Sequence, residues 1–188
     1  MNQFKKQNPT MEWITYDIEP IIRQKSLDVV LPLTADHVDV IEKLISYVDY
    51  SFENQHKKYN ILPGVGMASI QVGKLYRLAY IHFFDEEVEH RYLFANPEII
   101  KESSRKIYLH NGEGCLSVDC KHEGIVPRSA KIKIKFLDLF TNKEDIIEAE
   151  GYLAIVFQHE IDHTNGKLYY DKINKFNANF AKDDWEKI

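Results

Sequence analysis

One long stretch of the chain carries apolar side chains at helical spacing. After Thr34, which suits an N-cap, the apolar positions recur three and four residues apart: Val40, Ile41, Leu44, Ile45, Val48 and Phe52. The spacing predicts an amphipathic helix over 35–58 that ends near Asn60 and packs on a core. Before it, we expect 1–10 to be a loose polar extension and 18–23 to be a short helix broken around its proline.

The middle of the chain has the character of strands. Residues 75–84 and 89–95 are rich in aromatic and branched side chains and flank an acidic turn at 85–87, which predicts a hairpin closed by Asn96-Pro97. A short strand is predicted over 106–109.

The stretch 131–136 alternates lysines with apolar residues, which predicts a half-buried strand with a solvated lysine face. A turn at 141–143 then leads to a returning strand over 145–149.

A second helix differs from the first because residues 152–157 are apolar on every side. This pattern predicts a buried helix, and Asn165-Gly166 supplies its stop signal. The tail, 172–188, carries Phe176, Phe180 and Trp185 among polar residues, so it is expected to pack back as a helix or a strand. Together the segments predict an α+β fold with mostly antiparallel sheets around the buried helix.

Composition narrows the class of protein. A chain of 188 residues with 44% hydrophobic residues suits one domain with a proper core, and no apolar run approaches the length of a membrane span. We see no secretory signal, and two cysteines make no disulfide framework, so a cytoplasmic protein is expected. The net charge of −5 argues against broad nucleic-acid binding through phosphate neutralisation, although it leaves room for a local basic patch, and we expect no specific nucleic-acid recognition.

The end of the buried helix carries the pattern H-E-x-x-H. His159 and His163 lie four residues apart, so both imidazoles can point at one metal ion. Glu160 would flank the ion and take a proton from a metal-bound water. The alternative is an exposed helix face with ordinary surface charges, but buried groups without partners would cost several kcal/mol. The pattern therefore favours a metal site.

A hydrolytic metal site usually has three protein ligands. The sequence offers Cys115, in a bent stretch with glycines on both sides of Glu113, and Cys120, in a polar stretch. We favour Cys115, although a free cysteine is often only a small buried apolar residue. The glycines at 64 and 66 by themselves indicate no more than a tight turn.

Three blocks together resemble the motifs of peptide deformylase, in the family's order. They are the stretches 64–71 (GVGMASIQ), 113–117 (EGCLS) and 158–163 (QHEIDH). Asn96-Pro97 and Val126-Pro127-Arg128 also match, so the resemblance covers 27–171, and the long first helix is similar to the second bacterial subtype. The first block departs from the family pattern at Ser69 and Ile70.

The resemblance implies a metal-dependent hydrolase that removes the N-formyl group from the N-terminal methionine of new proteins and releases formate. Cys115, His159 and His163 would hold one divalent ion, Fe²⁺ in the cell, with Zn²⁺, Ni²⁺ or Co²⁺ able to replace it. Glu160 would be the general base. The side-chain amide of Gln71 and the backbone N–H of Leu116 would stabilise the oxyanion.

Further roles follow from the same resemblance. Glu113 and Arg128 would form an ion pair behind the cysteine loop. Val65 and Gly66 would pair with the extended peptide, and Val156 with His159 would line the methionine pocket. The implied partners are nascent N-formylmethionyl peptides and the ribosome near its exit tunnel, with no membrane, and a monomer is expected. We place the catalytic domain at 27–171, between an N-terminal extension (1–26) and a C-terminal tail (172–188).

Two other functions fit parts of the sequence. A zinc peptidase of the H-E-x-x-H type would need a third His or Glu ligand downstream, but only Glu186 follows His163. An inactive relative that only binds nascent chains or ribosomes would not need Glu160. Only the altered first block favours that alternative, so a deformylase is the function that we predict.

Overall fold

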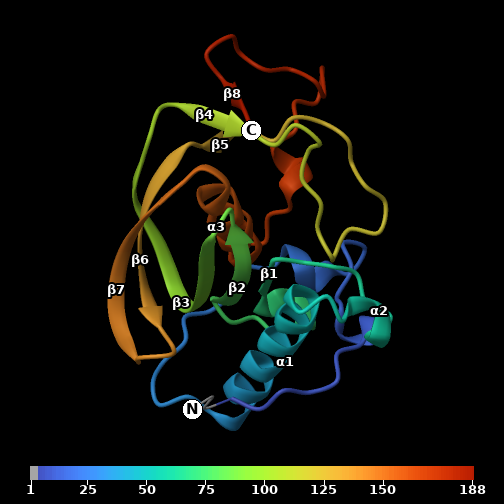
Figure 1. Ribbon diagram of the computed structural model, residues 1–188, viewed down its shortest axis with the longest axis vertical. Coiled ribbons are helices and arrows are strands. Elements are labelled where there is room, and N and C mark those ends of the chain that lie inside the picture. The colour runs from blue at the N-terminus through green and yellow to red at the C-terminus, as the bar shows by residue number, and fades with distance from the viewer. Residues whose placement is uncertain (1–3) are drawn as a thin grey trace.

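The computed structural model describes residues 4–188 and is built around one curved sheet (Figure 1). The five-stranded sheet has the order β1-β2-β3-β6-β7, and all of its neighbours pair antiparallel. Its strands are β1 (Gly66–Ala68), β2 (Leu78–Asp85), β3 (Val88–Glu102), β6 (Lys131–Asp138) and β7 (Lys143–Glu150). A smaller sheet has the order β5-β4-β8, formed by β5 (Arg128–Ser129), β4 (Lys106–Tyr108) and β8 (Glu186–Lys187).

Within residues 4–188, three α-helices accompany the sheets: α1 (Ala35–Phe52), the single-turn α2 (His56–Tyr59) and α3 (Gly151–Thr164). The predicted α+β fold with mostly antiparallel sheets around a buried helix is confirmed. Among the described residues, no helix combines the length and the apolar character that a membrane crossing requires.

Strand β2 separates two apolar cores. Its alternate side chains face opposite sides, so Leu78 and Tyr80 pack with α1 while Ala79, Ile81 and Phe83 pack with α3. Both faces of this strand are therefore buried, and α3 lies in the hollow of the curved sheet (Figure 1). In this position α3 contacts β1, and Glu160 of α3 packs against Gly66 of β1.

The first helix is shorter than predicted. Thr34 caps it as expected, because its Oγ accepts a hydrogen bond from the backbone N–H of His37 at 3.2 Å. The helix ends at Phe52, so the prediction of one helix to residue 58 was wrong. Asn54 and Asn60 both have left-handed backbone conformations, with φ of 57° and 51°, and these turns isolate α2.

The predicted hairpin is confirmed, with its bounds shifted. Strand β2 starts at Leu78 rather than at 75, and its pairing with β3 ends at Ala95 as expected. The chain does not leave the sheet there. Asn96 takes a left-handed conformation at a bulge, and β3 continues to Glu102 beside β6.

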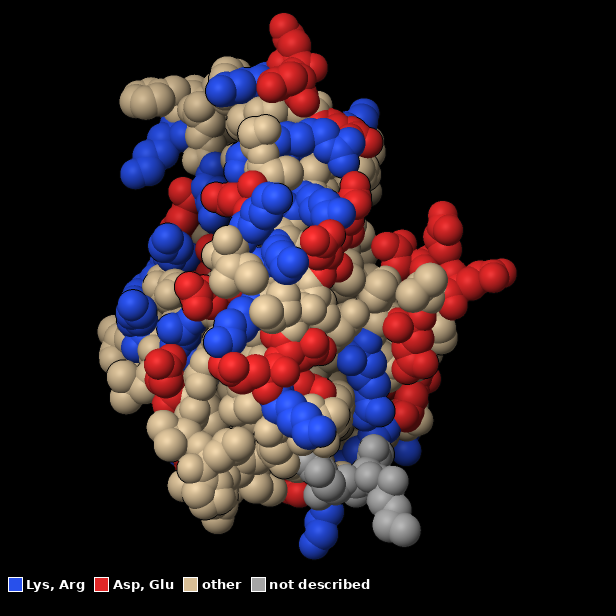
Figure 2. Space-filling model, turned by 90° about the vertical axis from the view of Figure 1, so that its left-hand side faces the viewer, with Lys and Arg blue, Asp and Glu red and all other residues tan. Residues whose placement is uncertain are grey.

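The lysine-bearing strand and its return are also confirmed as β6 and β7. Ile132, Ile134 and Phe136 are buried, while the lysines face outward. Lys131 pairs with Glu148 at 2.8 Å, and blue and red side chains interleave over this side of the molecule (Figure 2). The lysine row is thus a solvated face with balanced charge.

The N-terminal segment packs on the domain, which corrects the prediction of a loose extension for 1–10. Phe4 is buried in the core beside α1, and the backbone N–H of Gln7 donates to Ser46 Oγ at 2.8 Å. The first three residues lie outside the described part of the chain. Pro20 begins a 3₁₀ turn, Pro20–Arg23, rather than breaking a helix.

The tail is mostly irregular and ends in β8, which pairs parallel with β4. Phe176 is fully exposed, so it does not pack back as we expected, whereas Phe180 and Trp185 contact each other.

Candidate metal centre

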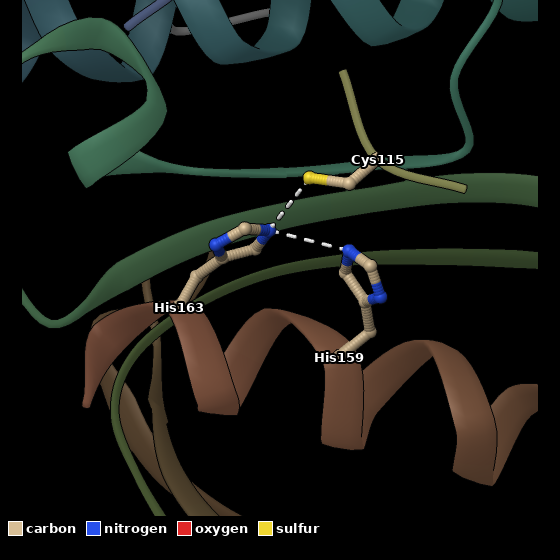
Figure 3. Close-up of side chains that lie close together, drawn as sticks. All are labelled: Cys115, His159 and His163. Atoms are coloured by element: carbon tan, nitrogen blue, oxygen red, sulfur yellow. Dashed lines mark hydrogen bonds between the residues drawn. The ribbon is translucent and has the colours of Figure 1, made fainter. Parts of the chain in front are cut away.

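The last turns of α3 present two imidazoles on one face. His159 and His163 lie four residues apart, and their Nε2 atoms approach to 3.2 Å (Figure 3). The Sγ atom of Cys115 lies 3.2 Å from His163 Nε2, and the donor atoms of all three residues lie within 4.8 Å of one another. Sulfur and two imidazole nitrogens are a donor set that suits Zn²⁺ or Fe²⁺.

The cysteine reaches the helix from a separate loop. In Figure 3 it faces the two histidines across the site, and the main-sheet strands pass behind them. Cys120 is exposed and does not belong to the cluster. The prediction that Cys115, rather than Cys120, joins the two histidines is therefore confirmed.

A buried ion pair stands behind this cluster. Glu113 Oε2 lies 2.8 Å from Nδ1 of His159, which directs the opposite nitrogen of that ring toward Cys115. The guanidinium of Arg128 donates two hydrogen bonds to Glu113, at 2.8 and 2.9 Å. Burial opposes the charge on Glu113, but Arg128 and His159 outweigh it and lower the pKa of that carboxyl to about 2.

Arg128 also donates to Asp162, a residue that the sequence analysis missed. Asp162 lies three residues after His159, so helical spacing places it near the same face of α3. Arg128 is 1% exposed. It contacts two carboxylates, those of Glu113 and Asp162, which flank the metal ligands.

Glu160 points into the site from a buried position. It is 3% exposed, and among residues 4–188 its Oε2 has no hydrogen-bond partner. Burial raises the pKa of Glu160 to about 7, although His159 and Arg128 act in the opposite direction. A buried carboxyl of this kind beside three converging donor atoms fits a bound cation.

The pKa values of the two imidazoles shift in opposite directions. Burial by itself would lower the pKa of both rings. For His159, hydrogen bonds to Cys115 and Glu113 outweigh burial, so its pKa rises well above the usual value. The pKa of His163 falls well below it, because the His159 and Arg128 charges add to the effect of burial.

Gln71 lies against the same cluster. Its Oε1 accepts a hydrogen bond from the backbone N–H of Ala68 at 2.8 Å, and this contact fixes the orientation of the amide. The opposite end, Nε2, lies 3.5 Å from Cys115 Sγ and 3.2 Å from Ser117 Oγ. Gln71 is 1% exposed, so its N–H groups face the site rather than solvent.

A cavity of about 410 Å³ opens onto these residues. Val65, Gly66 and Val156 line it together with Gln71, Cys115, Leu116, His159 and Glu160. The wall also includes Leu62, Leu109, Tyr152 and Ile155, which the sequence analysis did not propose. The sequence could have indicated Tyr152 and Ile155, because they precede His159 by seven and four residues and helical spacing places all three side chains on one face of α3.

The comparisons with known proteins agree with this geometry. The family model described as polypeptide deformylase matches residues 11–179. A peptide deformylase of Malacoplasma penetrans is 48% identical over 185 residues, which cover 98% of this chain and all of that protein. The chain belongs to the peptide deformylase family.

Two further relatives extend the comparison. A protein of Bacillus anthracis named peptide deformylase 2 is 37% identical and covers 95% of this chain and 97% of its own length. The crystal structure of a peptide deformylase from Ehrlichia chaffeensis superposes with a TM-score of 0.70 at 25% identity, covering 90% of each chain. The chain is a peptide deformylase, a metal-site hydrolase that removes the N-formyl group from the terminal methionine of new proteins.

The two departures from the deformylase pattern lie away from the cavity. Ser69 is fully buried, and its Oγ donates to the backbone carbonyl of Lys74 at 2.9 Å. Ile70 is also fully buried and belongs to the core between the sheet and α3. Both side chains stabilise the 3₁₀ turn Ser69–Val72 from behind, so the segment that carries Gln71 keeps its place.

Proposed function

We propose that Cys115, His159 and His163 hold one divalent ion, and that Glu160 is the general base for formyl removal at this ion. The observation that supports this most directly is the burial of Glu160 beside the three converging donor atoms, at the end of an apolar cavity. Neither a surface helix nor a simple binding groove would need a buried carboxyl there.

The three donor atoms restrict which divalent ion can bind, but they suit more than one. Cys115, His159 and His163 would hold the ion, which would supply Lewis acidity that lowers the pKa of a water molecule toward neutrality. Family resemblance favours Fe²⁺ in the cell, while Zn²⁺, Ni²⁺ and Co²⁺ suit the same donors in a purified sample.

Glu160 moves the proton. A carboxyl whose pKa is raised to about 7 can accept a proton near neutral pH and release it again. We infer that it takes a proton from the attacking water as oxygen adds to the formyl carbon. It then gives that proton to the amine nitrogen as the carbon–nitrogen bond breaks, leaving formate and a free amino terminus.

Gln71 and Leu116 stabilise the negative oxygen that forms during attack. The fixed amide of Gln71 directs an N–H toward the site, and the backbone N–H of Leu116 follows the ligand Cys115 directly in the chain. Removal of one such donor costs on the order of 3 kcal/mol of barrier in other enzymes.

The substrate peptide enters along the edge strand β1. This strand pairs with β2 on one side only, so Val65 and Gly66 can pair with an extended chain on the other. The methionine side chain would lie in the apolar part of the cavity, against Tyr152, Ile155 and Val156. Filling the cavity also excludes bulk solvent from the site, apart from the water that reacts.

The cellular context follows from the reaction. The substrates are nascent N-formylmethionyl chains, so we propose a monomer that works in the cytoplasm close to the ribosomal exit tunnel. We keep Glu113 and Arg128 as positioning residues, because Glu113 contacts Nδ1 of His159 and Arg128 holds Glu113 in place.

The test is formate release from formyl-Met-Ala-Ser together with metal analysis. Protein purified without oxygen and loaded with Fe²⁺ should carry one ion per chain and release formate. Cys115→Ser should lose the ion and at least 100-fold in rate, while the matched control Cys120→Ser should keep both. Full activity in Cys115→Ser, or no formate from a wild-type protein with one bound ion, would contradict the proposal.

A further inference from the structure

A second hollow, which we call the outer groove, lies directly behind the mouth of the catalytic cavity. It measures about 380 Å³ and is lined by Ser51, Phe52, Pro63, Gly64, Val65, His82, Phe83 and Phe84. Pro63, Gly64 and Val65 line the catalytic cavity as well. One short backbone segment therefore separates the two hollows, and a chain leaving the first passes over it toward the second.

The floor of the outer groove is aromatic and firmly held. The ring of Phe52 stacks on His82 with centroids 3.8 Å apart, and Phe84 lies beside it at 5.3 Å. The ring nitrogens of His82 are hydrogen-bonded to carboxylates, Nδ1 to Asp49 at 2.7 Å and Nε2 to Glu89 at 2.8 Å. Phe84 is nevertheless 56% exposed, so a large apolar surface faces solvent at this point.

The groove is bordered by negative charge. Asp85 ends β2, Glu86 and Glu87 form the turn that follows it, and among residues 4–188 none of the three carboxylates has a Lys or Arg within ion-pair distance. The acidic side chains of β7 differ, because lysines of β6 pair with them. An apolar floor next to unpaired carboxylates complements an apolar side chain followed by basic ones.

The direction in which the substrate peptide runs determines which of its residues reach the outer groove. The reacting end must lie near Gly66, where a Cβ atom would come within 2.6 Å of Glu160 Oε1. Pro63 lies three residues away along the same segment. An extended chain advances about 3.3 Å per residue, so its first residue lies near Gly66 and its third near Gly64. The fourth to sixth residues then reach Pro63, Phe52 and Phe84.

We propose that the outer groove binds the fourth to sixth residues of the substrate chain, and that it favours an aromatic or aliphatic side chain followed by lysine or arginine. This inference rests on the proposed function, because it takes the direction of the peptide from the position of Glu160. Continuity with the catalytic cavity favours the substrate itself over a separate protein as the occupant.

The test compares two hexapeptides, formyl-Met-Ala-Ser-Phe-Lys-Lys and formyl-Met-Ala-Ser-Gly-Glu-Glu, with the tripeptide formyl-Met-Ala-Ser. At low salt, the wild-type kcat/KM should be at least about fivefold higher for the basic hexapeptide than for the acidic one, mainly because KM is lower. This ratio of the two kcat/KM values should shrink in high salt. In the double variant Glu86→Gln/Glu87→Gln the ratio should fall at least twofold and lose its dependence on salt, while the preference for phenylalanine at the fourth position remains. Because the ratio is taken within one preparation, loss of folded protein does not change it.

The matched control is Asp183→Asn/Asp184→Asn, which removes two exposed carboxylates in the tail, outside the groove lining. It should keep the wild-type ratio, although the net charge changes equally. Equal rates for both hexapeptides in the wild type, or an unchanged ratio in the Glu86/Glu87 variant, would overturn the inference.

Two further measurements separate the alternatives. Absence of tripeptide turnover would count against the proposed function. The affinities of the two hexapeptides, measured by calorimetry, would then test separately whether the outer groove binds the basic peptide. The groove predicts tighter binding of the basic peptide, and equal binding would overturn it. A basic peptide without a formyl-methionine that binds strongly and does not compete with the tripeptide would instead assign the groove to a separate chain.

Discussion

At the scale of single residues, Glu160 packs against a position that leaves no room for a side chain. A Cβ atom added to Gly66 would lie 2.6 Å from Oε1 and 3.2 Å from Cγ of Glu160. Glu160 is 3% exposed and lines the cavity, so a side chain at position 66 would push the carboxylate from its place toward the cavity. The glycine therefore sets where the carboxylate lies relative to the metal ligands.

Gly66→Ala should lower turnover at least 100-fold while the protein keeps its metal, because the carboxylate must shift away from its working position. Formate release and metal analysis on the same sample measure both effects. Gly64→Ala is the matched comparison, since its Cβ would meet only the end of the flexible Leu116 side chain at 3.0 Å. A smaller loss in Gly66→Ala than in Gly64→Ala would contradict this account.

Gln71→Glu tests the role of the amide. The two side chains have the same shape, but the glutamate has no N–H to donate and adds negative charge where the oxyanion forms. We expect kcat to fall by at least 100-fold, with the metal still bound. Full activity in this variant would remove Gln71 from the mechanism.

The sequence predicted the residues of the metal site unequally. His159 and His163 follow from helical geometry, because the helix that carries them is evident from its apolar run. Cys115 is 44 positions upstream of His159, so no helical spacing connects the two, and the glycines around Glu113, the polar surroundings of Cys120 and then the family resemblance favoured it. Asp162 was missed because its partner Arg128 comes from a different element, and no local pattern connects the two.

At the scale of elements, the N-terminal segment contacts two of the three deformylase motifs and the residue that directly follows the third. The backbone N–H groups of Thr15, Asp17 and Ser26 donate to the carbonyls of Gln71, Ser117 and Thr164, at 2.8, 2.8 and 2.9 Å. These bonds involve only the backbone and carry no side-chain signature, so the sequence could not predict them. The domain boundaries at 26/27 and 171/172 stay predictions, but the contacts make residues 11–26 a structural part of the site.

Phe4→Ala should destabilise the fold without changing the chemistry. Phe4 is 8% exposed and packs in the core beside α1, so its truncation should lower the free energy of unfolding by about 2–3 kcal/mol. Denaturant unfolding followed by circular dichroism measures the loss, and kcat on formyl-Met-Ala-Ser should stay within twofold. An unchanged unfolding midpoint would show that the segment does not pack as described.

At the scale of the whole molecule, the fold depends on one sheet with an apolar core on each face. The class and most strands were predictable, because alternation and apolar runs report burial directly. The break after Phe52 and the continuation of β3 past Asn96 were not. In both places asparagines adopt left-handed conformations, and the surrounding packing decides whether the chain turns or continues.

Acid should unfold the protein partly through Asp49. This carboxyl is buried, which opposes its charge, but hydrogen bonds from His82 and Tyr80 outweigh burial and hold its pKa below the usual 3.8. A lowered folded-state pKa contributes stability that is present above about pH 4 and is lost as the pH falls further. Asp49→Asn should therefore flatten the decline of unfolding free energy between pH 5 and pH 3. Parallel declines in variant and wild type would contradict the assignment.

The most direct test of the account is formate release from formyl-Met-Ala-Ser by Fe²⁺-loaded wild type and Glu160→Ala, both prepared without oxygen and matched for bound metal. We expect rapid release by the wild type and a loss of at least 100-fold in the variant, because the proton would then have no acceptor in the site. Equal rates at equal metal content would contradict the central claim that Glu160 is the base of this deformylase.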